Sequence, residues 1–106
     1  MTKSKVSIII PHYNGIEVLS QCLDSLFQST YPNIEVIVVD NSSSDDSVDW
    51  LKTNHSQVIV IENDKNLGYA GGCNVGALTA SGEYLLFLNN DTCLLYTSPS
   101  PRDQVV

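Results

Sequence analysis

Four short apolar runs recur along the 106-residue chain, and their spacing restricts its fold more than any other feature. Most of them are rich in Val and Ile, which suits strands buried on both faces of a parallel sheet. The stretches between the runs place apolar residues at helical intervals. The resulting order β-α-β-α-β-α-β predicts an α/β fold, a mostly parallel sheet with helices on both faces. The runs are residues 6–10, 34–39, 58–61 and 84–88.

Local signals predict where these elements begin and end. Pro11 should end the first strand, because proline cannot donate a hydrogen bond to a sheet. Asn14 should open the first helix, with Glu17 three residues later completing a capping box. The serines of residues 42–44 should cap the second helix, and Asp45 and Asp46 should complement its dipole. A third helix is expected over residues 68–80. Its expected apolar face comprises Ala70, Cys73, Ala77 and Leu78.

Polar motifs follow three of the four expected strands. They are residues 11–14, 40–42 and 89–91. In an open parallel sheet, ligands bind beyond the carboxyl ends of the strands. We therefore expect these three motifs to meet at one edge of the sheet and to form a binding site there.

The charge of the chain excludes one class of partner. The net charge is −7, and only 5 Lys and Arg residues are present. Because a nucleic-acid-binding protein needs clustered basic side chains to neutralise phosphates, no nucleic-acid partner is expected. An acidic protein can still bind an anionic nucleotide through backbone N–H groups and a divalent cation.

Each candidate motif also has a structural explanation. Asp40 can accept hydrogen bonds from a base or ribose, or it can belong to a solvated turn. The glycine-rich residues 66–72 can let backbone N–H groups face a phosphate, or they can allow a helix to pack closely on the sheet. Residues 89–91 offer oxygen ligands for a hard cation, or they form a turn of Asx residues. Asp45 and Asp46 suit a helix terminus better than chemistry.

Taken in order, these motifs resemble the N-terminal part of family 2 glycosyltransferases with the GT-A fold, in its Rossmann-like nucleotide-binding half. The matching stretches are VSIIIPHYN (6–14), VVDNSSSD (38–45), NLGYAGGCNVG (66–76) and LFLNNDT (86–92). The third stretch is similar to the branch that includes rhamnosyltransferases and galactofuranosyltransferases.

The resemblance implies a role for each motif. Residues 11–14 would line the nucleobase pocket, and Asp40 would hydrogen-bond the base. Residues 89–91 would stand for the family's DxD motif, with Asp91 holding Mg²⁺ or Mn²⁺ on the pyrophosphate of a UDP- or dTDP-linked sugar. Asn89 replaces the first Asp of that motif, which puts metal affinity and ribose contact in doubt. The implied donor-binding residues are Pro11, His12, Tyr13, Asn14, Asp40, Asn66, Gly71, Asn89 and Asn90.

The implied reaction inverts the anomeric carbon and transfers the sugar to a saccharide or lipid-linked acceptor. In the family, a carboxylate base from the second half of the domain deprotonates the acceptor. This chain shows no match to that half. We therefore expect residues 1–92 to form a donor-binding part that is inactive alone, and residues 93–106 to be a tail of non-native appearance or a Pro/Ser linker.

The expected location is cytoplasmic, with a peripheral position at the inner face of the membrane in the full-length protein. The polar N-terminus and the short apolar run at residues 6–10 suit neither a signal peptide nor a membrane span.

Two other functions stay open at the level of sequence. A receiver-like interaction module would cluster acidic residues at the end of the first strand, where this chain has Pro11, His12 and Tyr13. A nucleotidyltransferase would carry a glycine-rich loop with a basic residue at the same place, and none is present.

Overall fold

The expected alternation of strands and helices is confirmed. The computed structural model describes residues 4–28 and 33–89. Asn90, Asp91 and the tail at residues 93–106 lie outside the described residues. In chain order the elements are β1 (Val6–His12), α1 (Ile16–Phe27), β2 (Ile34–Asp40), α2 (Ser47–Asn54), β3 (Ile59–Glu62), α3 (Gly68–Thr79) and β4 (Tyr84–Phe87).

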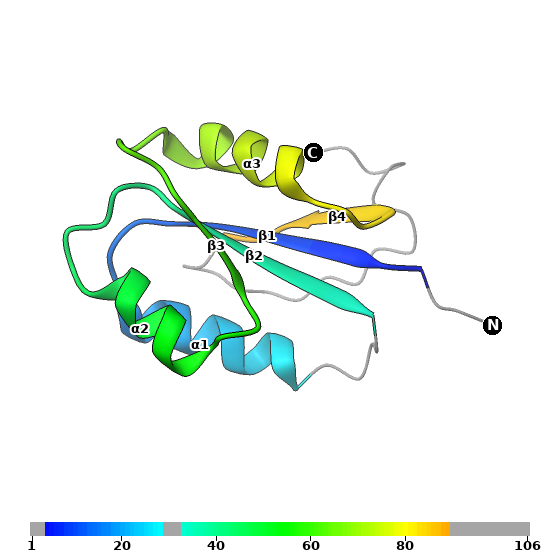
Figure 1. Ribbon diagram of the computed structural model, residues 1–106, viewed down its shortest axis with the longest axis horizontal. Coiled ribbons are helices and arrows are strands. Elements are labelled where there is room, and N and C mark those ends of the chain that lie inside the picture. Colours follow the sequence, from blue (N-terminus) through cyan, green and yellow to red (C-terminus); the bar gives the residue numbers. More distant parts are fainter. Residues whose placement is uncertain (1–3, 29–32, 90–106) are drawn as a thin grey trace.

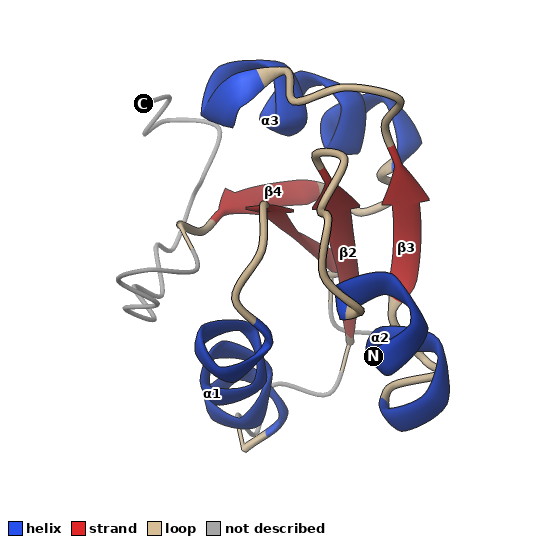
Figure 2. Cartoon of the chain, turned by 90° about the vertical axis from the view of Figure 1, so that its left-hand side faces the viewer, coloured by secondary structure: helices blue, strands red, loops and turns tan. Residues whose placement is uncertain are grey.

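The strands form one parallel sheet in the order β3-β2-β1-β4. Helices α1 and α2 cover one face of the sheet, and α3 covers the other (Figures 1 and 2). The predicted fold class, a parallel sheet between two layers of helices, is therefore confirmed. Within the described residues, no helix has the length and apolar character needed to span a membrane.

The central strands β1 and β2 bury both of their faces, as their apolar runs predicted. Ile8 and Ile10 pack in the cluster that includes the buried leucines of α1, whereas Ile9 between them packs in the cluster on the α3 side. Because successive strand side chains point to opposite faces, one uninterrupted apolar run supplies two cores. Burying each such side chain contributes about 1.5–3 kcal/mol. The buried leucines of α1 are Leu19, Leu23 and Leu26.

The first strand does not end at Pro11, as the sequence predicted, but continues through His12. The carbonyl of Ile9 accepts from Leu88 N, and the carbonyl of His12 accepts from Asn41 N. Alternate residues of a strand direct their backbone groups to opposite neighbours, so Pro11 faces the β4 side. The β1–β4 pairing ends at Ile9. Pro11 therefore occupies a position where no ladder donor is required.

Both predicted helix caps are wrong. Asn14 has a left-handed φ of 51°, and the residue before α1 is Gly15, with φ 103° and no side-chain cap. The capping box with Glu17 is absent because the side chain of Asn14 bonds to Ser44, in the loop after β2. The serines do not cap α2 either. Asp45 Oδ1 accepts the N–H of Ser47 at 3.0 Å, which confirms the expectation that Asp45 serves this helix terminus.

The buried face of α3 differs in part from the one predicted: Ala77 packs against the core as expected, but Leu78 does not. Leu78 is 88% exposed, whereas Gly72 and Gly76 are buried. A Cβ on Gly76 would overlap the side chain of Ile9, and one on Gly72 would lie 2.8 Å from Pro11 Cβ. These two glycines let the helix lie directly on β1. The packing explanation of residues 66–72 is therefore confirmed at Gly72, and Gly76 makes the same kind of contact further along the helix.

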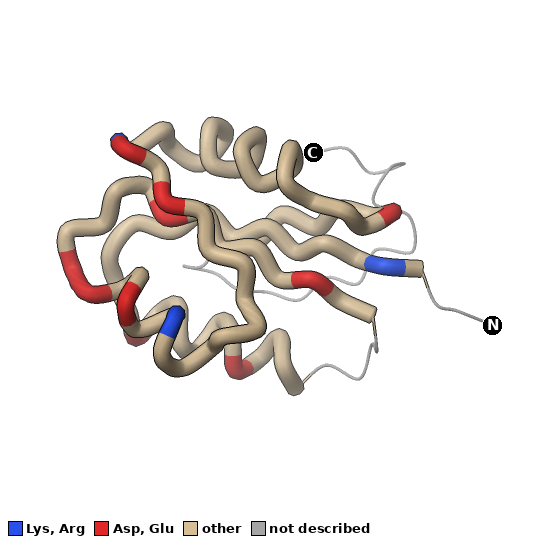
Figure 3. Tube along the Cα trace, viewed as in Figure 1, with Lys and Arg blue, Asp and Glu red and all other residues tan. Residues whose placement is uncertain are grey.

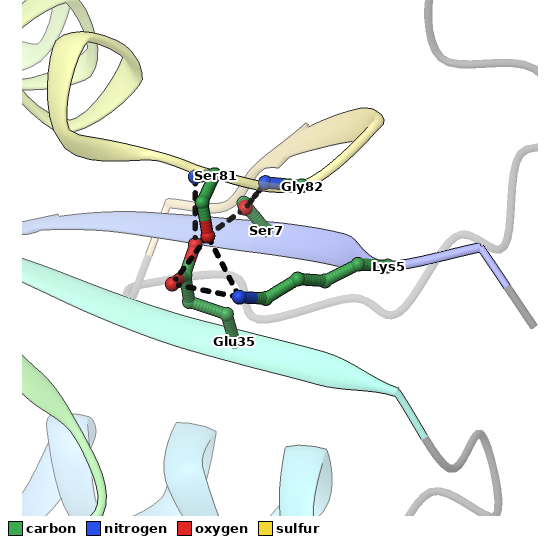
Figure 4. A network of polar contacts seen from close by, with 5 residues as sticks. All are labelled: Lys5, Ser7, Glu35, Ser81 and Gly82. Atoms are coloured by element: carbon green, nitrogen blue, oxygen red, sulfur yellow. Dashed lines mark hydrogen bonds and ion pairs between the residues drawn. The ribbon is translucent and has the colours of Figure 1, made fainter.

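At the amino end of the sheet, the carboxylate of Glu35 ties together β1, β2 and the turn after α3 (Figure 4). It accepts from Ser7 Oγ at 2.7 Å and from Ser81 N at 3.0 Å, and it pairs with Lys5 Nζ at 3.3 Å. The N–H of Gly82 donates to Ser7 Oγ at 2.8 Å. Desolvation raises the pKa of Glu35, but the hydrogen bonds from Ser81, Ser7 and Lys5 outweigh it and lower the pKa to about 2.

Candidate functional site

The described parts of the predicted motifs meet at the carboxyl ends of the strands. His12, the last residue of β1, pairs with Asp40, the last residue of β2. Because Leu88 N donates to Ile9 O, Asn89 follows β4 at the same edge. The expected convergence is therefore confirmed for the motifs after β1 and β2 and for Asn89. The loop after β3, residues 63–67, lies beside them, because Asn63 N donates to Asp40 O and Leu67 N donates to Asn41 Oδ1.

Asn14 joins the loop after β1 to the loop after β2. Its Oδ1 accepts the N–H groups of Ser44 and Asp45, at 2.9 and 3.3 Å. Its own N–H donates to Ser43 Oγ at 2.8 Å, and its Nδ2 donates to Ser44 Oγ at 3.2 Å. A short amide side chain suits this position, because Asn tolerates the left-handed backbone that Asn14 adopts. Its role is thus to fix the spacing of two loops.

Asp40 is buried, with only 3% of its surface exposed. Its Oδ1 accepts from Ser43 Oγ at 2.6 Å and its Oδ2 from Ser43 N at 2.9 Å. These contacts fix the loop after β2, but a side chain this deeply buried is not the solvated turn residue that the structural explanation described. A carboxylate has about four acceptor positions, and Ser43 uses two of them.

Asn41 joins the loop after β2 to the start of α3. Its Oδ1 accepts from Asn63 Nδ2 at 2.9 Å and from Leu67 N at 3.3 Å, and its Nδ2 donates to Gly68 O at 3.1 Å. The residue is 3% exposed. Asn41 was not among the predicted donor-binding residues. A polar residue directly after a buried strand is a signal that could have found it.

The predicted donor-binding residues differ in accessibility. Tyr13 is 50% exposed, whereas His12 is 1% exposed and Pro11 is buried. Asn66 and Asn89 are exposed. Tyr13, Asn66 and Asn89 can therefore meet a ligand directly, whereas Pro11 and His12 shape the site from below its surface.

The start of α3 lies at the same edge as these loops. Asn66 Oδ1 accepts the N–H of Gly68 at 2.8 Å, which caps the helix locally. A Cβ on Gly71 would lie 2.6 Å from Leu67 Cβ, so this glycine is required by the first turn of its own helix. The first turn of a helix presents N–H groups and the positive end of the dipole. This edge therefore offers donors that suit an anion.

An open pocket of about 350 Å³ adjoins Asp40 on the β3 side of the site. Its charged lining is mostly acidic, and Lys52 pairs with Glu62 at 3.2 Å. Figure 3 shows how Asp and Glu gather on the loops at this end of the molecule. Such a lining repels a diphosphate but accepts hydrogen bonds from neutral donors. The carboxylates around the pocket belong to Asp40, Asp45, Asp46, Asp49, Glu62 and Asp64.

No group of three or more His, Cys, Asp or Glu side chains in residues 4–28 and 33–89 could hold a metal ion. Asn89 lies at the edge where the metal was expected, but Asn90 and Asp91 are outside the described residues. The acidic pocket does not supply the missing ligands. The role of Asp91 as a metal ligand stays a prediction.

Comparison with known sequences places these features in a family. A family model described as "Glycosyl transferase family 2" matches residues 7–97. A poly(ribitol-phosphate) beta-glucosyltransferase of Bacillus spizizenii is 43% identical over 93 residues, which cover 82% of this chain and 15% of that protein. The UDP-Glc:alpha-D-GlcNAc-diphosphoundecaprenol beta-1,3-glucosyltransferase WfaP of Escherichia coli is 40% identical over 87 residues, 81% of this chain and 35% of that protein.

Solved structures show the same arrangement of elements. Residues 1–349 of S. aureus TarS in complex with UDP match with a TM-score of 0.75 and 32% identity, over 82% of this chain and 27% of that one. The mannosyltransferase PcManGT from Pyrobaculum calidifontis, in complex with GDP-Man and Mn²⁺, matches with a TM-score of 0.75 and 27% identity. That match covers 85% of this chain and 28% of the mannosyltransferase. The chain thus spans about a third or less of the proteins it resembles.

Proposed function

The chain belongs to glycosyl transferase family 2, and we propose that it forms the donor-binding part of an inverting enzyme that uses a nucleotide diphosphate sugar. The predicted family and GT-A fold are confirmed. Membership favours an enzyme over the receiver-like module and the nucleotidyltransferase. The rhamnosyltransferase or galactofuranosyltransferase branch stays a prediction, since the relatives compared are named glucosyltransferases and a mannosyltransferase.

The observation that carries the proposal is the meeting of Tyr13, Asp40 and the start of α3 at one edge of the sheet. Tyr13 is half exposed and can pack against a base. Asp40 lines the pocket and has acceptor capacity for the ring N–H of uracil or thymine. The donors of the α3 first turn suit the diphosphate. We place the base beside Asp40, since the acidic lining of the pocket disfavours the phosphates.

The neighbours support a nucleotide sugar as the donor, because one contains UDP and another contains GDP-Man. For this chain we propose a UDP- or dTDP-linked sugar. The name of WfaP specifies a lipid-linked acceptor. We propose a saccharide or lipid-linked acceptor here, and a peripheral position at the cytoplasmic face of a membrane.

We further propose that Asp91 holds Mg²⁺ or Mn²⁺, with Asn89 and Asn90 beside it. The presence of Mn²⁺ in the mannosyltransferase complex supports this assignment. When bound, the cation would neutralise charge on the leaving diphosphate. The protein residues have separate tasks: Tyr13 and Asp40 orient the base, and Asn14 holds their two loops in register. The catalytic base is assigned to no residue of this chain.

Calorimetric titration with UDP, dTDP and GDP, each with and without Mn²⁺, tests the proposal. We expect UDP or dTDP to bind more tightly than GDP, and Mn²⁺ to strengthen that binding. If none of the three nucleotides binds under either condition, the assignment of a donor site to this edge is wrong.

A further inference from the structure

His12 is the most deeply buried ionisable side chain at the donor edge, with 1% of its surface exposed. Its Nε2 lies 2.9 Å from Oγ of Ser47, the first residue of α2, which is fully buried. The imidazole is therefore separated from any ligand at the surface of the site. The hydrogen bond to Ser47 connects His12 to the loop after β2.

The contacts of Ser47 decide which atom carries the proton. Ser47 Oγ donates its only hydroxyl proton to Asp45 Oδ1. An ionised carboxylate can only accept hydrogen bonds. Desolvation raises the pKa of Asp45, but hydrogen bonds from Ser47 and Gly15 outweigh it and lower the pKa, which keeps the carboxylate ionised. Ser47 Oγ must then accept from His12, so Nε2 of the imidazole carries a hydrogen.

The chain of hydrogen bonds returns to the loop in which it began. Asp45 Oδ2 accepts the N–H of Gly15 at 2.9 Å. These hydrogen bonds, from His12 through Ser47 and Asp45 to Gly15, thus connect the two ends of the segment between His12 and Gly15. The residues of this segment are Tyr13, which is half exposed at the site, and Asn14, which has a left-handed backbone.

We propose that His12 is a positioning residue: through Ser47 and Asp45 it clamps the loop that presents Tyr13 and Asn14 to the nucleotide. This inference rests on the proposed donor site. Asn14 has a positive φ, which is less populated in a free chain for a non-glycine residue than for Gly15. If the clamp holds the loop in this conformation before the nucleotide binds, binding does not pay the entropy cost of ordering the loop. The imidazole itself touches no substrate.

Three variants of the full chain test the clamp. His12→Leu removes the donor, and His12→Gln restores an N–H at a similar distance from the backbone. Ser7→Ala is the matched control, because Ser7 is a fully buried, hydrogen-bonded residue of the same strand at its opposite end. We expect His12→Leu to weaken UDP or dTDP binding about tenfold, the scale of one lost hydrogen bond. His12→Gln should recover most of that loss, and Ser7→Ala should lower the melting temperature without changing affinity.

Amide hydrogen exchange at Gly15 provides a readout that needs no ligand. Exchange should be faster in His12→Leu than in wild type, and close to wild type in His12→Gln and Ser7→Ala. If His12→Leu does not fold, Ser47→Ala replaces it, since it removes the hydroxyl that links His12 to Asp45 and leaves the Asp45 acceptor of Gly15 in place. Unchanged Gly15 exchange in both of these variants would overturn the clamp. Failure of wild type to bind any nucleotide, with faster Gly15 exchange in His12→Leu, would instead overturn the donor site and leave the clamp standing.

Discussion

Replacing Gly76 by alanine should destabilise the protein although alanine is the better helix former. In an exposed helix the change from glycine to alanine stabilises by about 1 kcal/mol. At Gly76 the added Cβ would overlap Ile9 Cγ2 and lie 3.1 Å from Val39 Cγ2. Both neighbours are fully buried and belong to central strands, so neither can move away without disturbing the sheet. Overpacking of this kind costs about 1–3 kcal/mol.

The net effect expected for Gly76→Ala is a loss of up to about 2 kcal/mol in the free energy of unfolding, because the overpacking cost is offset by the gain in helix propensity. Urea denaturation followed by circular dichroism measures it directly. Asn74→Ala is the matched control, because Asn74 lies on the exposed side of the same helix. That variant should be as stable as wild type or slightly more stable, since alanine is favoured in helices.

The reasoning fails if Gly76→Ala is as stable as Asn74→Ala. Such a result would mean that α3 does not lie directly on β1. The glycine-rich segment would then owe its composition to another cause, such as close approach of its backbone to a ligand.

Two further predictions concern hydrogen-bonded residues at opposite ends of the sheet. Because the folded pKa of Glu35 is lowered from 4.5 to about 2, its ionised form stabilises the protein above about pH 4.5, and this contribution is lost as the pH falls toward 2. Glu35→Gln should therefore lower the free energy of unfolding by about 1–2 kcal/mol at pH 7, allowing for solvent screening at Lys5, and by much less at pH 2.5. A difference that does not depend on pH in denaturant titrations would contradict this. Asn41→Leu should leave Leu67 N without its acceptor, cost about 1–3 kcal/mol, and speed amide exchange at Leu67. Unchanged exchange would refute the role of Asn41.

The order of elements and their meeting at one edge could be predicted from the sequence, because both follow from local patterns. An apolar run such as residues 6–10 buries both faces wherever its strand lies in a sheet. Parallel strands joined by helices must place their carboxyl ends together. Tyr13, Asp40 and Asn89 were therefore found at the expected edge without knowledge of strand order.

The boundaries and buried polar contacts could not be predicted, because they depend on partners far away in the chain. Whether Pro11 interrupts a strand depends on which neighbour it faces, and that requires the strand order. Asn14 looked like a helix cap, but its amide bonds to Ser44, which is 30 residues away. Leu78 kept helical spacing and yet points outward, since two glycines occupy the contact with the sheet.

The same limit applies to His12. The family resemblance implied that it lines the base pocket. The structure buries its ring against Ser47, which belongs to helix α2. Spacing along the chain contains no signal for that contact.

Comparison of Asp40→Ala with Asp91→Ala, in nucleotide titrations with and without Mn²⁺, tests the donor site most directly. Asp40→Ala should weaken UDP or dTDP binding in both conditions, because its proposed partner is the base. Asp91→Ala should abolish the strengthening by Mn²⁺, at a cost of about 1.5–3 kcal/mol, or about one to two decades in affinity. If Asp91→Ala binds the donor as wild type does and keeps its response to Mn²⁺, and Asp40→Ala also binds normally, the donor site is not at this edge of the sheet.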